Sequence, residues 1–393
     1  MSDVSWWDAR AIAETVMPTG PTEQVRLGQA LGRTLCADAR AAVDLPGFAT
    51  AAMDGWVVAG TGPWSIVGTI DTGTPAEVSL REGQAMRIAT GGAVPVGAES
   101  VVPWEVARVD GDVVAAEIPD KLHIRPRGEE CVVGDVLARR TDVVNPALLG
   151  SLAAAGLDHL ETFRQPAVTV LIAGDEVVLS GIPQTGQVRD ALGVQLPGWI
   201  EAYGGLVREV IGVRDDPEVF TQALDAAAHE SDFVIVTGGT ARGHRDYLRS
   251  TLQNMDATLH VDGVAVRPGH PMTLATVGLT PVVGLPGNPL SALVAMVTLV
   301  EPIVDAWNGR AGRALPRVQM AEAIDASRKP LTRLMVGRRE LGGFRQVQHV
   351  SSAMLRGIAH ADGWAVVPPE GADEGQILAW IPVPWNRRTS DDS

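Results

Sequence analysis

The chain has 393 residues, of which 46% are hydrophobic and 20% are charged. Both fractions are ordinary for a globular protein, and the length exceeds what one hydrophobic core usually organises, so we expect several domains. The formal net charge of −15 at pH 7 disfavours nucleic acid as a partner, because sequence-independent binding to a phosphate backbone needs an excess of basic residues.

The two cysteines, Cys36 and Cys131, form no CxxC motif and no Cys/His cluster, so neither a disulfide framework nor a thiolate zinc site is predicted. The N-terminus lacks the basic start and apolar run of a signal peptide. The longest apolar stretch, Leu290–Val300, is too short to span a bilayer. We therefore expect a cytoplasmic protein that has no membrane partner.

In the N-terminal part of the chain, the sequence pattern changes from one typical of helices to one typical of β-strands. Apolar residues on one helical face predict a helix over Ser5–Met17, and Thr22–Leu31 predicts a second short helix. From about Asp44 to Leu137, short β-rich runs alternate with Gly, Pro and Asp turns, which predicts a β-domain. The runs are Trp56–Val58, Ser65–Val67, Ser100–Val102 and Val113–Ala116.

A regular alternation of strands and helices begins at Ala167. Repeated βα units of this length predict a parallel sheet with helices on both faces. The predicted strands are Ala167–Ile172, Leu206–Val213, Phe233–Thr237, Thr273–Val277 and Val282–Gly284. The predicted helices of this region are Leu192–Tyr203, Pro217–His229, Arg245–Met255 and a core helix over Leu290–Trp307. A small apolar helix over Ala147–Ala155 is predicted before it.

Beyond Arg310 the sequence pattern is again typical of β-strands, with short β-rich runs at Ala365–Val367 and Ile377–Ile381. These runs predict a small C-terminal domain.

Three polar or glycine-rich segments follow strands of the predicted sheet: IAGDEVV (Ile172–Val178), VTGGTARGHRDYL (Val236–Leu248) and GLPGNPLSAL (Gly284–Leu293). Each alone is compatible with a structural turn. Open parallel sheets bind their ligands outside the carboxyl ends of the strands, so the three segments share one edge. Carboxylates beside glycine-turn amides at such an edge predict a metal-assisted phosphate or anhydride site.

Two further segments, Gly47–Trp56 and Arg87–Glu105, are too polar and glycine-rich for a core. Asp54 could cap a turn or bind a metal, and Thr90 could be a turn hydroxyl or an anion donor. The chain has no HExxH pair, no GxSxG elbow, no GxxxxGK[ST] and no convincing GxGxxG after a strand. Zinc peptidases, serine hydrolases and the usual nucleotide-binding folds are therefore not supported.

In this order, the motifs resemble those of the molybdopterin molybdenumtransferases, the family that includes the E domain of gephyrin. GLPGNPLSAL differs at one position from the family's GLPGNPVSAL, and IAGDEVV resembles STGDEL. The resemblance also covers ALGRTLCADA, GFATAAMDGW, RIATGGAVPVGAESVV, RPRGEECVVGDVL, TGQVRDALG, VTGGTARGHRDYL and VAVRPGHPM, and so runs over nearly the whole chain.

The resemblance implies that adenylylated molybdopterin and molybdate are the substrates, that Mg²⁺ assists, and that AMP is released as molybdenum cofactor forms. It implies a multidomain α/β plus β fold in an elongated subunit, with a central doubly wound parallel-sheet domain of molybdopterin-binding type. The implied domains are residues 1–22 with 164–310 (central), 23–43 with 138–163 (small, two-segment), 44–137 (inserted, β-rich) and 311–393 (C-terminal, β-rich).

The resemblance also implies a homodimer in which Asp54 and Thr90 face Glu176 across subunits. A molybdopterin adenylyltransferase and acceptor molybdoenzymes are implied as further partners.

Position by position, the resemblance carries over three groups of residues. The expected catalytic residues are Asp54, Thr90, Glu176, Asp190, Asp215 and Asp246, of which Asp54, Glu176 and Asp190 are the expected metal ligands. The expected substrate-binding residues are Gly238, Gly239, Arg267, His270, Pro286, Gly287, Asn288, Pro289, Ser291, Arg338 and Ser352.

The chain departs from the family pattern where an oxyanion is expected. The family's KPGK reads Arg267 to His270, and a lysine often found four residues earlier is Gly263. The family's DSN reads Asp190-Ala191-Leu192. One lost cation and one that titrates near neutrality predict weaker capture of a dianion. Two alternatives therefore stay open: a carrier or scaffold that binds molybdopterin without efficient insertion, and an enzyme for another oxyanion such as tungstate.

Overall fold

The computed structural model describes residues 3–74, 78–118, 120–238 and 247–385. Its contacts divide the chain into two compact units. The first unit comprises Met1–Glu23, Gly32–Cys36 and Thr162–Ser393, and the second comprises Gln24–Leu31 and Ala37–Glu161. The finer division into four domains stays a prediction.

A six-stranded sheet with the order β16-β13-β17-β21-β20-β18 forms the centre of the first unit. The pairs β13–β16, β13–β17 and β17–β21 are parallel, as expected from the βα alternation. The pairs β20–β21 and β18–β20 are antiparallel, so the sheet is mixed at this edge. The reason is the short turn between β20 and β21, since a parallel connection needs a crossover of a dozen residues or more. The strands span Leu206–Val213 (β16), Ala167–Ala173 (β13), Phe233–Thr237 (β17), Thr280–Leu285 (β21), Thr273–Val277 (β20) and Thr258–Asp262 (β18).

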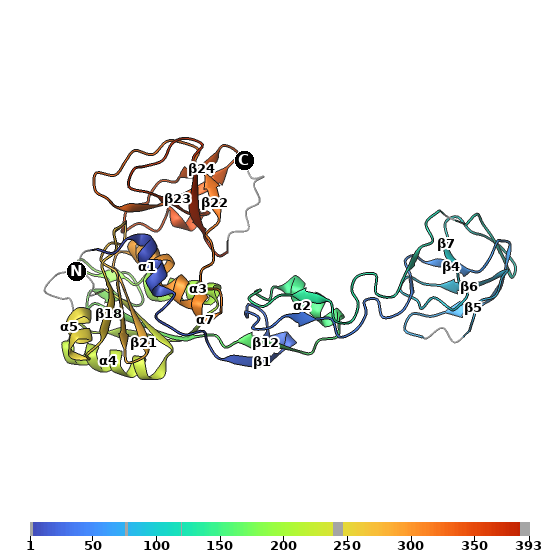
Figure 1. The fold of residues 1–393 in the computed structure, drawn as a ribbon, viewed down its shortest axis with the longest axis horizontal. Coiled ribbons are helices and arrows are strands. Elements are labelled where there is room, and N and C mark those ends of the chain that lie inside the picture. The colour runs from blue at the N-terminus through green and yellow to red at the C-terminus, as the bar shows by residue number, and fades with distance from the viewer. Residues whose placement is uncertain (1–2, 75–77, 119, 239–246, 386–393) are drawn as a thin grey trace. The chain divides into compact units, whose positions relative to one another are not determined.

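Helices cover both faces of this sheet (Figure 1). Along β17, Phe233 and Ile235 enter one hydrophobic core, whereas Val234 and Val236 enter the other. This alternation follows from the two-residue period of a strand. The first core contains α1 (Trp6–Ala13), α3 (Leu192–Tyr203) and the helix that begins at Pro289, and the second contains α4 (Pro217–Glu230) and α5 (Tyr247–Asn254).

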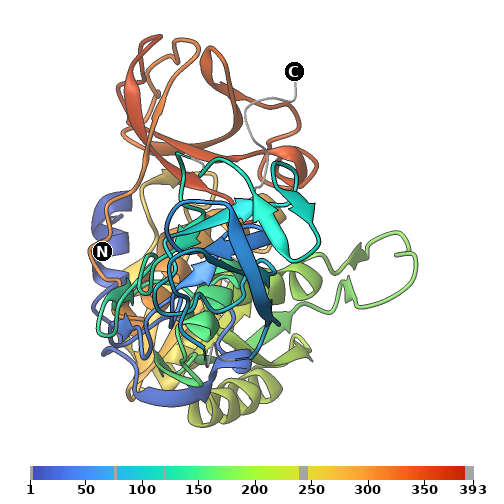
Figure 2. The same cartoon turned by 90° about the vertical axis from the view of Figure 1, so that its right-hand side faces the viewer.

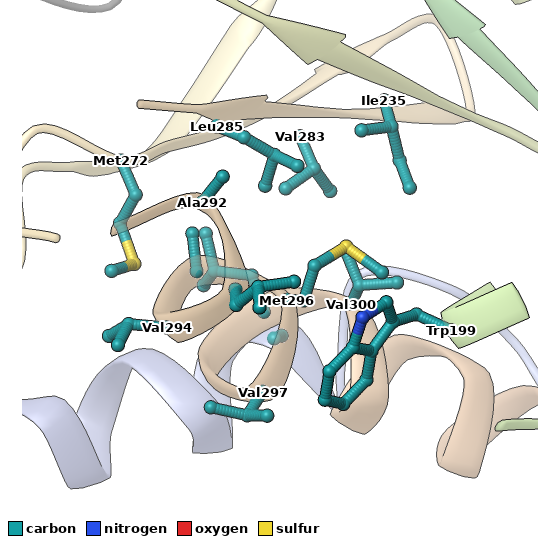
Figure 3. Packing of buried hydrophobic residues seen from close by; sticks show 14 of the residues in the cluster. Trp199, Ile235, Met272, Val283, Leu285, Ala292, Val294, Met296, Val297 and Val300 are labelled. Carbon is teal, nitrogen blue, oxygen red and sulfur yellow. The ribbon is translucent and has the colours of Figure 1, made fainter. Parts of the chain in front are cut away.

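The long apolar helix predicted over Leu290–Trp307 consists of α6 (Pro289–Ala295), a π-helical stretch (Met296–Val300) and α7 (Glu301–Trp307). By length and composition it could cross a membrane, but 89% of its apolar window is buried inside the fold. Figure 3 shows Met296 beneath the strand residues Ile235 and Val283. The helix is therefore a core element of this unit, as predicted.

The C-terminal part of the first unit is a sheet with the order β19-β23-β25-β26-β22, and β24 pairs with β23. The predicted β runs at residues 365–367 and 377–381 lie in β25 and β26. Its core continues into that of the central sheet, where the rings of Trp199 and Trp364 lie 5.7 Å apart. The strands span Val266–Arg267 (β19), Arg317–Gln319 (β22), Thr332–Glu340 (β23), Gly343–Gln346 (β24), Gly363–Val367 (β25) and Ile377–Pro382 (β26).

The second unit contains the β-rich segment, as expected. Its sheet has the order β7-β4-β6-β5-β9-β8, and every β run predicted between residues 56 and 116 falls on one of these strands. The strands span Gly55–Val58 (β4), Trp64–Ile70 (β5), Gln84–Ile88 (β6), Ser100–Pro103 (β7), Arg108–Asp110 (β8) and Val113–Ala115 (β9). Two small pairs, β3 (Thr50–Ala51) with β10 (Ile124–Arg125) and β2 (Ala39–Arg40) with β11 (Val136–Ala138), and helix α2 (Pro146–Ala154) complete it.

The prediction of a helix over Thr22–Leu31 is wrong. Thr22–Arg26 is strand β1, which pairs with β12 (His159–Phe163), and only Leu27–Gln29 forms a short 3-10 helix. The strand depends on a partner more than a hundred residues away, which a short sequence window does not contain. Elsewhere the architecture is the expected multidomain α/β plus β.

One ion pair in the first core involves α1 and α7. Arg10 Nη1 donates to Glu301 Oε2 at 2.9 Å and also to the carbonyl oxygen of Val297. Burial raises the pKa of Glu301 above its ordinary value of 4.5, and the charge of Arg10 opposes that rise. Glu301 is therefore a buried carboxylate whose ionised form depends on Arg10.

Arg10→Met should destabilise the fold by about 3 kcal/mol at neutral pH, because it leaves this carboxylate buried without its partner. Without Arg10 the pKa of folded Glu301 rises further, so the folded state holds a proton that the unfolded state releases above pH 4.5. The loss should therefore grow as the pH rises from 4.5 towards 7. Urea unfolding at both pH values measures it, with Arg208→Met at the exposed Arg208–Glu230 pair as the control. An equal loss at both pH values would contradict this account.

Candidate functional site

A cavity of about 540 Å³ lies where strands β13 and β17 end. Ile172 and Ala173 line it from β13, and Thr237 lines it from β17. The ends of parallel strands open onto one edge of the sheet, so loops from distant parts of the chain meet there. The expected site residues that line this cavity are Glu176, Asp190, Gly238, Gly287, Asn288 and Pro289.

Glu176 is positioned by a turn that requires glycine. Gly174 has a φ of +132°, and a Cβ there would lie 2.9 Å from Glu176 Oε2. After Glu176 the chain forms β14 (Val177–Val178), which pairs with β15 (Val188–Arg189). Figure 2 shows the segment between these short strands, in light green, extending from the body of its unit. This pairing brings Glu176 and Asp190 to one cavity although they lie on separate segments.

Asp190 stabilises the start of helix α3. Its Oδ1 accepts hydrogen bonds from the backbone N–H groups of Leu192 at 3.0 Å and Gly193 at 2.8 Å. These are orphan donors of a helix N-terminus, so the carboxylate both caps the helix and lines the cavity.

The carboxylates of this cavity suit one kind of metal ion. Within the described residues no group of three or more His, Cys, Asp or Glu side chains could hold a metal ion. Glu176 and Asp190 nevertheless line the same cavity. Mg²⁺ is usually bound through one or two carboxylates together with substrate phosphates and water. The donor set therefore fits Mg²⁺ that arrives with a phosphorylated ligand, and not a dedicated protein cage.

Several expected residues have other roles or positions. The N–H of Gly238 donates to the carbonyl oxygen of Leu285 at 3.1 Å, so this amide is not free to receive an anion as expected. Asp215 and Pro286 do not line the cavity. The N–H of Asp215 donates to Oδ1 of Asp175 at 3.1 Å, and Asp175 is the residue that precedes Glu176. Gly239 and Asp246 lie outside the described residues.

A second cavity, of about 670 Å³, lies between the central sheet's loops and the C-terminal sheet. Four expected residues line it: Arg267, His270, Ser291 and Ser352. Lys329 and Arg333 also line it, and neither was expected. Strand pairing explains the position of Arg333, because β19 and β23 are parallel and place Arg267 directly beside Arg333.

The expectation that Arg338 contacts an oxyanion is not supported. Arg338 does not line this cavity, and its Nε donates to the carbonyl oxygen of His360. Arg338 lies five residues beyond Arg333 on strand β23. The residues of β23 that line the cavity end at Val336, two positions before Arg338.

The second cavity is positively charged. Arg267, Lys329 and Arg333 line it, and no Asp or Glu is among the described residues that do. Arg333 donates through Nη2 to the carbonyl oxygen of Asp325, but its buried Nε has no hydrogen-bond partner. A buried donor without an acceptor is costly, and a bound anion would supply the acceptor. This cavity therefore suits an oxyanion.

His270 lines the same cavity but has a carboxylate partner. Its Nε2 lies 2.9 Å from Asp3 Oδ2. The N-terminal residues hold Asp3 there, because Val4 forms a β-bridge with Val264. Gly263, at the position of the family's earlier lysine, faces both residues of this pair. The positive charge that His270 could offer to an anion is thus shared with Asp3.

The two cavities adjoin at the start of helix α6. Pro289 lines the first cavity and Ser291 the second. The carbonyl oxygen of Ser352 accepts the N–H groups of Leu290 at 2.9 Å and Ser291 at 3.3 Å, and Ala353 reaches the first cavity. A ligand with a phosphate-bearing end in one cavity would therefore lie beside an oxyanion in the other.

Asp54 and Thr90 belong to the second unit, where they contact each other. Asp54 Oδ1 accepts hydrogen bonds from the N–H of Thr90 at 2.6 Å and from its hydroxyl at 2.8 Å. These bonds, the backbone one first, lower the pKa of Asp54 below its ordinary value. Asp54 is thus an ionised carboxylate at neutral pH, held on the turn before β4.

The chain is similar to known proteins over most of its length. Residues 4–156 match a family model described as the MoeA N-terminal region (domain I and II), and residues 169–306 match a probable molybdopterin binding domain. A relative from Mycobacterium tuberculosis, named molybdopterin molybdenumtransferase 2, is 32% identical over 311 residues, covering 75% of this chain and 76% of the relative. A molybdopterin molybdenumtransferase from Haemophilus influenzae is 30% identical, covering 77% and 76% respectively.

A solved structure supports the fold. The crystal structure of a molybdopterin biosynthesis MoeA protein from Pyrococcus horikoshii OT3 matches with a TM-score of 0.78 and 21% identity, covering 97% of this chain and all of that one.

Proposed function

This chain belongs to the molybdopterin molybdenumtransferase family, and on that premise we propose that it inserts molybdate into adenylylated molybdopterin, releasing AMP and molybdenum cofactor. The observation that carries the proposal is the pair of adjoining cavities at the start of α6. One is lined by the carboxylates Glu176 and Asp190, and the other by the cations Arg267 and Arg333.

The first cavity takes the anhydride end of the pterin substrate. Glu176 and Asp190 would hold Mg²⁺ against the substrate's phosphates, and Gly287 and Asn288 contact the substrate from the loop before α6. When bound there, Mg²⁺ supplies positive charge that neutralises the pyrophosphate and polarises its phosphoryl oxygens. Because Asp190 also caps α3, the first turn of this helix fixes its carboxylate in place.

The second cavity takes molybdate. The guanidinium groups of Arg267 and Arg333 would donate charge-assisted hydrogen bonds to its oxygens, and the Ser291 hydroxyl would add a neutral donor. The mechanism needs no covalent nucleophile in the chain. The protein's contribution is to hold two anionic substrates side by side, which removes most of the entropic cost of their encounter.

The acting form in this proposal is a cytoplasmic homodimer. Asp54 of the partner subunit, held by its hydrogen bonds from Thr90, would face Glu176 and add a third carboxylate for the metal. The lowered pKa of Asp54 supports this role, because the carboxylate is ionised without a metal ion. In this proposal, a molybdopterin adenylyltransferase supplies the substrate, and acceptor molybdoenzymes receive the product.

The test is AMP release by the purified protein. With adenylylated molybdopterin and Mg²⁺ present, the proposal predicts AMP only after molybdate is added. Tight binding of the adenylylated pterin with no AMP release on addition of molybdate would instead indicate a carrier. Release that responds to tungstate but not to molybdate would indicate another oxyanion.

A further inference from the structure

The second cavity contains a cation that the family motifs do not explain. Lys329 lines it from the segment just before strand β23. The first residue of β23, Thr332, donates its N–H to the carbonyl oxygen of Ala265 at 3.0 Å. That bond ties the Lys329 segment to the chain just before Arg267. Lys329 is one of only two lysines in a chain with 32 basic residues of Lys and Arg.

The Lys329 ammonium group is available to a ligand. It is exposed, and among residues 3–74, 78–118, 120–238 and 247–385 no carboxylate forms an ion pair with it. Its backbone oxygen accepts the N–H of Leu331 at 2.7 Å, which forms a tight turn at the cavity's rim. The side chain is thus an exposed positive charge beside a hydrogen-bonded turn.

The position where the family pattern has a lysine does not offer a comparable charge here. His270 Nε2 lies 2.9 Å from the Asp3 carboxylate, so a negatively charged group accompanies this side chain at the cavity. Gly263 replaces the earlier lysine. The cavity therefore lacks the lysine that Gly263 replaces, pairs His270 with a carboxylate, and contains two cations, Lys329 and Arg333, that the family motifs did not predict.

We propose that Lys329 is a molybdate-binding residue that supplies the positive charge that Gly263 and His270 do not. Arg267 and Arg333 contact the oxyanion where strands β19 and β23 pair, and Lys329 contacts it from the segment before β23. This inference rests on the proposed function, because it takes molybdate as the ligand of this cavity. It predicts a preference for dianions, since three cations face the site.

The expected effect of Lys329 is moderate. An exposed ion pair contributes little, but the ligand's double charge strengthens the attraction. We expect removal of Lys329 to weaken molybdate binding by about three- to tenfold. The effect should shrink at high salt, because exposed charges are screened.

The experiment compares Lys329→Gln, Lys329→Arg and the matched control Lys121→Gln, the other lysine, which is exposed in the second unit. Equilibrium dialysis with molybdate gives the dissociation constant, and AMP release gives the half-saturating molybdate concentration. Lys329→Gln should raise both by the same factor and leave the rate at saturating molybdate unchanged. Lys329→Arg should restore most of the binding, and Lys121→Gln should match the unaltered protein.

The outcomes separate this inference from the proposed function. If the unaltered protein releases AMP and Lys329→Gln binds molybdate equally well, the inference fails and the function stands. If molybdate binding depends on Lys329 but no AMP is released, the function fails and the inference stands. Absence of molybdate binding by the unaltered protein would overturn the inference, because the cavity would then not be an oxyanion site.

Discussion

Glu176→Gln should lower molybdate-dependent AMP release by about 100- to 1000-fold, the usual cost of removing one preorganised charge at a reacting phosphoryl group. The substitution keeps the side chain's shape, so the turn at Gly174 and the β14–β15 pair should persist. Asp190 would then be the one carboxylate among the described residues lining this cavity, and it already accepts two backbone hydrogen bonds. Single-turnover AMP release measures the effect.

The control for this result is Asp225→Asn, which removes a carboxylate from the exposed His229–Asp225 pair on α4. It should leave AMP release unchanged. The Glu176 variant should also keep binding molybdate, because the second cavity does not include this residue. A Glu176→Gln protein that releases AMP at the unaltered rate would remove Glu176 from the proposed chemistry.

Asp54→Asn should be as inactive as Glu176→Gln, and mixing the two variants should restore activity. In a two-fold dimer with sites shared across subunits, the mixed species has one site with both substitutions and one site with neither. The intact site should release AMP. The measurement needs the two variants to be co-expressed with different affinity tags, so that only mixed dimers are assayed.

A mixed dimer without activity would contradict a site shared across subunits. If Asp54 and Glu176 act within one subunit, every site in the mixed dimer carries one substitution, and the purified mixed dimer stays inactive. A chain that purifies only as a monomer would also contradict the dimer proposal. Asp54→Asn keeps acceptor capacity for the Thr90 bonds, so folding of the turn is a smaller concern than it would be for alanine.

The central α/β sheet was predictable because its signals are local. Helix α3 and strands β16, β17 and β20 have the predicted limits. Strand β17, which is buried throughout, and the three-turn helix α3 each carry their own apolar pattern. Strand β1 was missed because its pairing with β12 is set by a distant segment. The antiparallel edge of the sheet was not expected either, although the two-residue turn between β20 and β21 contains the necessary signal.

Parts of the candidate site were predictable where a sequence motif directly follows the end of a predicted strand. Glu176, Asp190 and the turn before α6 were expected together, and the structure brings them to one cavity. Arg333 was missed because motif spacing does not give a strand's register, whereas its pairing with Arg267 does. The His270–Asp3 contact was equally hidden, because it joins residues that are far apart in the chain. Charge at the second cavity is therefore a property of tertiary structure and not of the KPGK-like motif alone.

The adjoining cavities predict that anhydride cleavage and molybdate insertion are coupled. If anhydride cleavage and molybdate insertion share one site at the start of α6, neither event should occur without the other. The direct measurement quantifies AMP and molybdenum cofactor in the same single-turnover reaction, the cofactor being detected by activation of an apo-molybdoenzyme. The account predicts equal amounts of both, and neither product without molybdate. AMP formed in the absence of molybdate, or AMP formed with no active cofactor, would contradict it.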